Sequence, residues 1–154
     1  RHDLILMQDL QDEKQCTHMK EHSVIKKFRN GLTDKFTAIK NGTFGLWAAV
    51  LKETDKMIGQ CGLTMQQWKD QEVLEIGYLF ERSHWHQGYA TEAAKACKQY
   101  AFEKLNASEV CSIIRDSNTA SQNVAMRNGM VMKDQWIKHY KGVDMPHYRY
   151  VVYR

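Results

Sequence analysis

The sequence contains 154 residues, of which 43% are hydrophobic and 26% are charged, and its formal net charge is +4. This composition is typical of one folded domain and excludes a disordered chain, and no apolar run approaches the roughly 20 residues that span a bilayer. Residues 1–80 hold 11 basic and 11 acidic side chains, and residues 81–154 hold 11 and 7. This excess is too small for a nucleic-acid surface. It would suit one polyanionic small ligand, although from charge alone chance scatter is the better explanation.

Hydrophobic patterning predicts a single domain over residues 1–154. Strands are expected where apolar residues alternate or run together between polar turns: 4–7, 44–52, 57–65, 72–80, 110–115, 131–138 and 147–153. The segment 66–71 is expected to be a polar connection. Helices are expected over the polar-rich segments 9–21 and 23–40, over 90–105, and over 121–128 with Gly129 ending the last one.

The strand over 72–80 and the helix over 90–105 have the clearest patterns. One face of the strand carries Leu74, Ile76, Tyr78 and Phe80, and the other carries Val73, Glu75, Gly77 and Leu79. The helix has a buried face of mostly small residues, which are Ala90, Ala93, Ala94, Cys97, Ala101 and Leu105. The order β-α-α-β-β-β-α-β-α-β-β predicts an α/β (α+β) fold with one mixed, mostly antiparallel central sheet flanked by helices.

The cysteines indicate neither a disulfide framework nor a metal site. Cys16, Cys61, Cys97 and Cys111 form no C-x-x-C pair and have no zinc-like spacing with histidine. Because no apolar segment behind a basic one opens the chain, we expect no secretory signal, no membrane partner and reduced thiols in a cytoplasmic protein. Cys97 and Cys111 are expected to be small core residues, so they suggest no covalent route.

The segment 85–93 follows a predicted strand and opens a helix. A helix start has unpaired N–H groups and the positive end of the helix dipole, so it can bind phosphate. Gly88 has no side chain to hinder an approaching phosphate, and Ala90 is nearly as small. On Gly88 alone, a plain turn glycine is the better explanation, because neither the Walker loop nor the three-glycine dinucleotide fingerprint is complete. His84 and His86 lack further ligands, so we expect no metal.

Several motifs together resemble the GNAT superfamily of acetyl-CoA-dependent N-acetyltransferases, and more closely its RimJ/RimL-like branch of ribosomal-protein alanine acetyltransferases. They are Glu75-Ile76-Gly77-Tyr78, Trp85-x-x-Gly88-Tyr89-Ala90-Thr91-Glu92-Ala93, Asn118-x-x-Ser121-x-x-Val124-Ala125-x-x-Asn128-Gly129-Met130, Lys141-Gly142 and His147-Tyr148. The resemblance is strong from about residue 57 to the end. It is weak in the first part, where acceptor specificity is usually set.

This resemblance implies a cosubstrate and an acceptor. The cosubstrate would be acetyl-CoA, with no metal, and the acceptor a primary amine, either a protein N-terminus or a small molecule. The acetyl group would pass by direct attack of the amine in a ternary complex, in a monomer or a homodimer. A catalytically silent acyl-CoA sensor is the alternative, and a nucleotide-binding protein is a poorer one.

The resemblance also assigns residues to the cosubstrate. The pyrophosphate would bind backbone N–H groups of His86, Gln87, Gly88, Tyr89, Ala90 and Thr91, although many relatives have glycine where His86 stands. The pantetheine arm would add to a splayed strand edge and bind backbone groups of Tyr78, Leu79 and Phe80. Gly77 predicts a bulge or a close backbone approach there, or a glycine that favours packing. Asn118 would bind the cosubstrate arm.

Two residues are predicted to assist the reaction. Glu75 lies in an apolar stretch where burial would raise its pKa toward neutrality, which suits a general base; the alternative is a solvent-facing glutamate. The resemblance implies that Ser121 protonates or stabilises the departing CoA thiolate, as in the alanine-acetyltransferase branch, whereas many other relatives use a tyrosine where Ala125 stands. Asn118 and Ser121 are also plausible helix-capping residues, and that simpler role is a strong alternative.

Overall fold

The computed structural model describes residues 4–7 and 45–154. The predicted helices over 9–21 and 23–40, and Cys16, lie outside the described residues. The first described strand, β1 (Leu4–Met7), confirms the strand predicted there.

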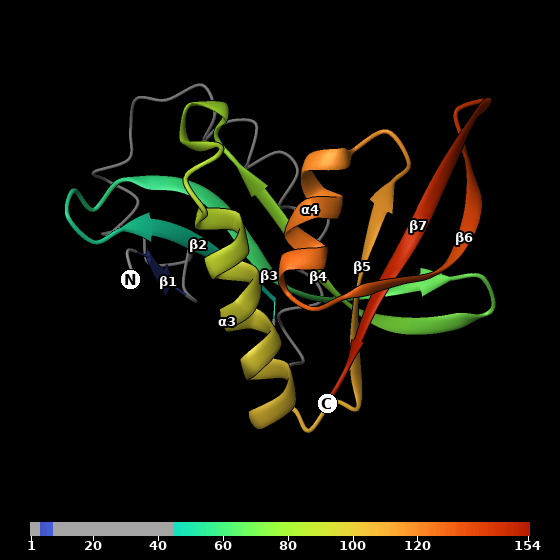
Figure 1. Cartoon of the computed structure of the whole chain (residues 1–154), viewed down its shortest axis with the longest axis horizontal. Coiled ribbons are helices and arrows are strands. Elements are labelled where there is room, and N and C mark those ends of the chain that lie inside the picture. Colours follow the sequence, from blue (N-terminus) through green and yellow to red (C-terminus); the bar gives the residue numbers. More distant parts are fainter. Residues whose placement is uncertain (1–3, 8–44) are drawn as a thin grey trace.

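The described strands form one seven-stranded sheet in the order β1-β2-β3-β4-β5-β7-β6 (Figure 1). Every neighbouring pair is antiparallel except β4 and β5, which are parallel. The predicted mixed, mostly antiparallel sheet is therefore confirmed. After β1 the strands are β2 (Leu46–Leu51), β3 (Met57–Trp68), β4 (Gln71–Phe80), β5 (Glu109–Arg115), β6 (Val131–Tyr140) and β7 (Val143–Tyr153).

The connection predicted over 66–71 is wrong, because β3 continues to Trp68 and pairs with Gln71 of β4. A buried side chain explains the difference: Trp68 is fully buried in a cluster with Val73, Cys111 and Val151. Only two residues remain for the turn, and Lys69 adopts a left-handed φ of 52° there, as tight hairpin turns require.

Among the described residues, two α-helices cover one face of the sheet, α3 (Tyr89–Glu103) and α4 (Thr119–Arg127), and Figure 1 shows them side by side in front of the strands. The predicted small-residue face of α3 is confirmed, because Ala93, Ala94, Cys97 and Ala101 are buried against the sheet. Gly129 follows the C-cap of α4 with a φ of 81°, which confirms its predicted place at the helix end.

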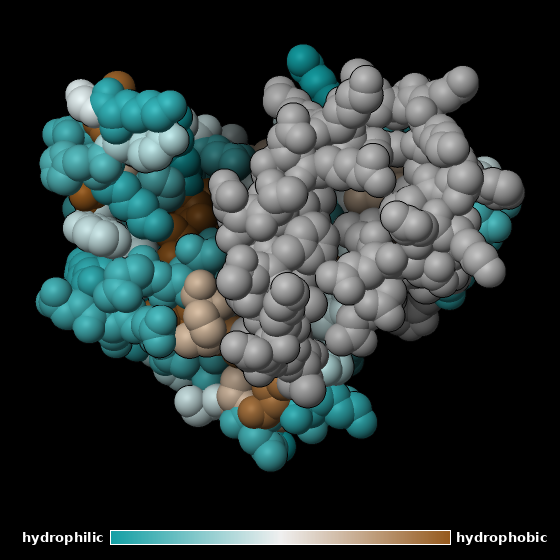
Figure 2. Space-filling model, turned by 180° about the vertical axis from the view of Figure 1, so that it is seen from behind, coloured by the Kyte–Doolittle hydropathy of each residue, from teal (hydrophilic) through white to brown (hydrophobic). Residues whose placement is uncertain are grey.

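The buried apolar residues of the described ranges form two clusters, one on each face of the sheet. The larger one lies between the sheet and the two helices, and it includes Ile76, Phe80 and Ala125. The smaller one, around Trp68, lies on the opposite face. Figure 2 views the molecule from behind, where the described surface is mostly hydrophilic with small apolar patches. Within the described part of the chain, no helix is long and apolar enough to cross a membrane.

Candidate active site

The centre of the candidate site is the place where β4 and β5 part. The two parallel strands share a single register pair, Glu75 with Cys111. Figure 1 shows the strands diverging beyond this point toward their carboxyl ends, with α4 in front of them. The register of β3 with β4 is continuous through Gly77, and a Cβ on Gly77 would meet nothing within 4 Å. The predicted bulge at Gly77 is therefore absent from the β3–β4 ladder, and the opening lies between β4 and β5.

The backbone of β4 alternates between its two neighbours. The Glu81 N–H donates to the Ile58 carbonyl of β3 at 2.8 Å, and the β3–β4 ladder has no register shift. Successive residues of a strand direct their backbone groups to opposite sides, so those of Leu79 face β3. The groups of Tyr78 and Phe80 face the side on which β5 diverges. The register therefore argues against the predicted contact of the Leu79 backbone with the pantetheine arm.

Side chains bind two backbone groups that lie where the strands part. The Ser112 hydroxyl donates to the Ile76 carbonyl at 2.9 Å, and the Ile113 N–H donates to Glu75 Oε1 at 3.2 Å. Glu75 is half-buried, so it is neither fully solvated nor fully enclosed. Its carboxylate is thus held at the root of the opening.

Burial governs the neighbouring titratable groups. Cys111 is 1% exposed, and this burial, together with the negative charge of Glu75, raises the pKa of its thiol to about 12. Burial also raises the pKa of Tyr78 and of Cys61. The predicted core positions of Cys97 and Cys111 are confirmed, and both are free thiols. The raised pKa values keep the Cys61 and Cys111 thiols and the Tyr78 hydroxyl protonated near neutral pH.

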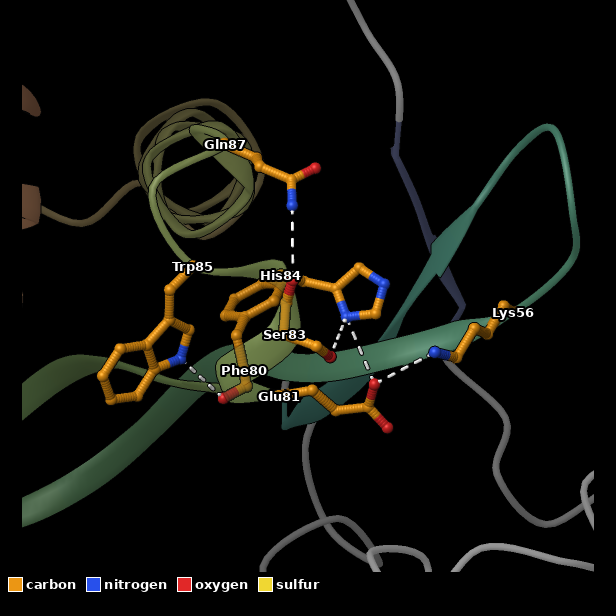
Figure 3. A network of polar contacts seen from close by, with 7 residues as sticks. All are labelled: Lys56, Phe80, Glu81, Ser83, His84, Trp85 and Gln87. Carbon is orange, nitrogen blue, oxygen red and sulfur yellow. Dashed lines mark hydrogen bonds and ion pairs between the residues drawn. The ribbon is translucent and has the colours of Figure 1, made fainter.

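A polar network orders the loop between β4 and α3 (Figure 3). The Glu81 carboxylate contacts Lys56 Nζ at 3.3 Å and His84 Nδ1 at 3.2 Å. The Trp85 indole N–H donates to the Phe80 carbonyl at 3.0 Å, so this ring folds back over the end of β4. The network includes a single turn of 3-10 helix, η3 (Arg82–His84). The loop is therefore held from both sides before the helix begins.

Two left-handed residues shape the turn that opens α3. His86 has a φ of 62° and Gly88 a φ of 88°, a region that disfavours side chains other than glycine. His86 thus keeps the conformation for which a glycine is ordinarily preferred. The first backbone bond of the helix runs from the Glu92 N–H to the Gly88 carbonyl at 3.0 Å. The N–H groups of Tyr89, Ala90 and Thr91 therefore precede the helical ladder.

The start of α4 lies beside β4. Asn118 is the N-cap, and its Oδ1 accepts the Ser121 N–H at 3.1 Å, so the capping role considered for it is confirmed. The Tyr78 hydroxyl donates to the Ser121 carbonyl at 2.8 Å, which fixes Ser121 against β4. Ala125, one turn later, is 1% exposed.

Asn128 joins the end of α4 to the beginning of α3. Its Nδ2 donates to the carbonyls of Thr91 at 3.3 Å and Val124 at 3.1 Å, while Lys98 Nζ donates to its backbone carbonyl at 2.7 Å. Asn128 is 3% exposed. Asn128 therefore ties the first turn of α3, next to the phosphate-binding turn proposed from the sequence, to the end of α4.

The sequence did not indicate the hydrogen bonds made by the Ser112 and Tyr78 hydroxyls, or the contacts of the Asn128 side chain with both α3 and α4. The available signal for Ser112 was one hydroxyl inside the apolar strand 110–114, because a buried polar group must find a partner. Among the described residues, no three histidine, cysteine, aspartate or glutamate side chains are arranged to hold a metal ion.

Comparisons with known proteins agree with this architecture. Protein YkkB of Bacillus subtilis (strain 168), itself uncharacterised, is 46% identical over 85 residues, which are 55% of this chain and 49% of YkkB. The chain spans about half the length of the curated relatives it matches.

Two solved structures show the same fold. The acetyltransferase from Agrobacterium tumefaciens str. C58 aligns with a TM-score of 0.70 at 23% identity, over 98% of this chain and 91% of that one. RimL, a ribosomal L7/L12 alpha-N-protein acetyltransferase solved in complex with coenzyme A, aligns with a TM-score of 0.68 at 16% identity, over 83% and 72% of the two chains.

The family follows from the sequence match. Residues 2–131 match the Acetyltransferase (GNAT) domain, a span that covers most of the chain and includes β4, the loop and both described helices. The protein therefore belongs to the GNAT family of acetyltransferases.

Proposed function

We propose that the protein transfers the acetyl group of acetyl-CoA to a primary amine by direct attack within a ternary complex. GNAT acetyltransferases take this group from acetyl-CoA. The observation that carries the proposal is the opening of the sheet at Glu75, which lies on the same strand that leads into the left-handed turn before α3. One strand thus connects a carboxylate to a run of helix-terminal N–H groups.

The residues present fit the cosubstrate. A Cβ on Gly88 would meet nothing within 4 Å, so the turn is open where a pyrophosphate would approach the N–H groups from His86 to Thr91. The backbone groups of Tyr78 and the N–H of Phe80 would bind the pantetheine amides, as an added strand binds a sheet edge. Asn118 and Ser121 at the start of α4 would lie at the thioester end.

Glu75 would act as the base. The acceptor amine must lose a proton before its nitrogen can attack; free α-amino groups titrate near ~8 and lysine side chains near ~10.4, so an α-amine is the easier target. The carboxylate would take this proton directly or through water. The nitrogen forms a bond to the acetyl carbon, the carbon–sulfur bond breaks, and the thiolate leaves with stabilisation from the Ser121 hydroxyl.

A covalent enzyme intermediate is disfavoured by the described cysteines. Cys61, Cys97 and Cys111 are all buried, and burial raises the pKa values of Cys61 and Cys111. A buried thiol that stays protonated is a poor nucleophile. This supports direct attack by the amine over transfer through cysteine.

The motifs quoted above support a RimJ/RimL-like acceptor, a protein N-terminal α-amine, with a small-molecule amine as the other candidate. RimL is named as an alpha-N-protein acetyltransferase. Ala125 supports the same branch, since a buried position on α4 holds no tyrosine that could protonate the thiolate. Cytoplasmic location and a monomeric or homodimeric state remain parts of this proposal.

The test combines calorimetry with thiol release from acetyl-CoA against a panel of amines and N-terminal peptides. We expect binding of acetyl-CoA and thiol release with at least one acceptor. Tight binding without thiol release for any amine would instead support the acyl-CoA sensor. ATP competing as well as CoA would favour the nucleotide-binding alternative.

Glu75→Gln tests the base. We expect kcat to fall by about 100-fold or more, as for loss of a general base, with little change in acetyl-CoA affinity. The loss should be greatest below pH 8, where the acceptor is protonated. A rate that is unchanged across pH would rule out Glu75 as the base.

A further inference from the structure

The point where β4 and β5 part has an irregular hydrogen-bond pattern. In a regular parallel ladder, every second residue of one strand bonds to two residues of its neighbour. The pair Glu75 with Cys111 would then be followed by Gly77 with Ile113. Because the groups of Ile76 face β5, the Ile113 N–H would donate to the Ile76 carbonyl.

The structure replaces this bond with two others. The Ile76 carbonyl accepts the Ser112 hydroxyl at 2.9 Å, and the Ile113 N–H turns to Glu75 Oε1 at 3.2 Å. Ser112 is 2% exposed, so its hydroxyl has no bulk water to bind instead. The single Ile113 amide hydrogen is directed at Glu75 Oε1, so the regular bond is not made, and the Ser112 hydroxyl is the donor found at the Ile76 carbonyl in its place.

We infer that Ser112 is a positioning residue for Glu75: its hydroxyl occupies the Ile76 carbonyl and thereby leaves the Ile113 amide on the Glu75 carboxylate. This inference rests on the proposed role of Glu75 as the base. An amide that donates to a carboxylate stabilises the charged form. Ser112 would thus set both the width of the opening and the proton affinity of the base without touching either substrate.

The described groups around Glu75 bear on its titration. Cys111 of β5 lies beside it in register, and Tyr78 of β4 is close enough for the Glu75 charge to raise its pKa. Arg149 of β7, which lies opposite Ile113 of β5 in register, is 4% exposed and donates hydrogen bonds to the carboxylate of Asp134 of β6. Because their pKa values are raised, Cys111 and Tyr78 stay neutral near pH 7. Their ionisation therefore does not shift the titration of Glu75 in that range.

The first experiment uses the unmodified chain. The backbone amide of Ile113, followed by nuclear magnetic resonance, should shift with pH as the Glu75 carboxyl titrates, and Glu75→Gln should abolish that shift. An Ile113 amide that does not follow Glu75 would overturn the inference, whatever the variants do.

The second experiment compares Ser112→Ala, which removes the hydroxyl, with Ser112→Thr, which keeps it. In Ser112→Ala the Ile113 amide can return to the Ile76 carbonyl, so the carboxylate loses a donor. We expect the carboxyl pKa of Glu75, measured by ¹³C resonance, and the acidic limb of the kcat/KM profile to move up together by about one pH unit. Ser112→Thr should restore both. If either variant fails to fold, Ser112→Cys, with its weaker donor, should give a smaller shift in the same direction.

The outcomes separate this inference from the proposed function. Folded Ser112→Ala with an unshifted Glu75 pKa would overturn the role of Ser112, while the loss of rate in Glu75→Gln would still support the base. Lost activity in Ser112→Ala with both pH readouts unchanged would indicate a structural role only, which also overturns the inference. No effect of Glu75→Gln on the rate would refute the proposed base itself.

Discussion

Gly88 offers the sharpest test of the turn before α3. Its φ of 88° lies in the left-handed region, and a Cβ there would come within 4 Å of no other residue in the described part of the chain beyond its neighbours in the sequence. Gly88→Ala therefore adds no clash inside the protein. It adds only the conformational cost of a side chain in the left-handed region, about 1–2 kcal/mol.

This cost should appear in the binding of coenzyme A. In the free protein the turn can relax and avoid the strain, but pyrophosphate binding needs the N–H groups in their present directions. The strain is then added to the binding free energy, and 1–2 kcal/mol corresponds to a dissociation constant about 5- to 30-fold larger. Gly88→Val should weaken binding further, because its branched side chain also extends into the space where a phosphate would approach.

Isothermal titration calorimetry with coenzyme A measures the effect, and the chain supplies two matched controls. Gly142 lies in the β6–β7 turn with a φ of 76° and no atom within 4 Å of its Cβ position, so Gly142→Ala has the same strain far from α3. It should lower stability without changing affinity. His86→Gly removes strain at φ 62° and should bind at least as well as the original chain. Folded Gly88→Ala with unchanged affinity would refute the phosphate role of this turn.

Two further variants test the contacts around this turn. Asn128→Leu removes the donors to the Thr91 and Val124 carbonyls and should lower the free energy of unfolding by about 1–3 kcal/mol in urea denaturation; a loss below about 0.5 kcal/mol would make the link between the helices unimportant. Ser121→Ala should lower kcat by less than about tenfold, because a thiolate whose thiol titrates near ~8.5 leaves with little help. A much larger loss in steady-state kinetics, with Tyr78 still bonded to the carbonyl, would show that the hydroxyl is essential.

The fold was largely predictable because its strands and α3 have strong periodic patterns. The small face of α3 was visible in the spacing of Ala93, Ala94, Cys97 and Ala101, and these residues are buried. The end of β3 was not predictable from its polar residues. Trp68 is buried by contacts with β5 and β7, which depend on strands about 40 to 80 residues later in the chain.

The part of the candidate site that depends on local backbone conformation could be predicted from the sequence. The part that depends on the pairing of β4 with β5 could not. The turn at Gly88 follows from a motif on a strand–loop–helix connection, and even the departure at His86 leaves the left-handed conformation in place. The splayed strand edge was expected from the family resemblance, and Gly77 by itself indicated only a bulge, a close backbone approach or a packing glycine. At the opening, Ser112 bonds to Ile76 and Ile113 bonds to Glu75, and these partners become known only when β5 is aligned with β4.

An opened sheet leaves backbone groups that must find other partners, and the molecule supplies these from side chains. Buried groups left unpaired cost about 1–3 kcal/mol each, so a parting of β4 and β5 without replacements would be unstable. Ser112 satisfies the Ile76 carbonyl, Glu75 satisfies the Ile113 amide, and the Trp85 indole satisfies the Phe80 carbonyl. The same bonds that make the opening stable therefore place a carboxylate at its root and the loop at its rim, so stability and the arrangement proposed for catalysis have one physical origin.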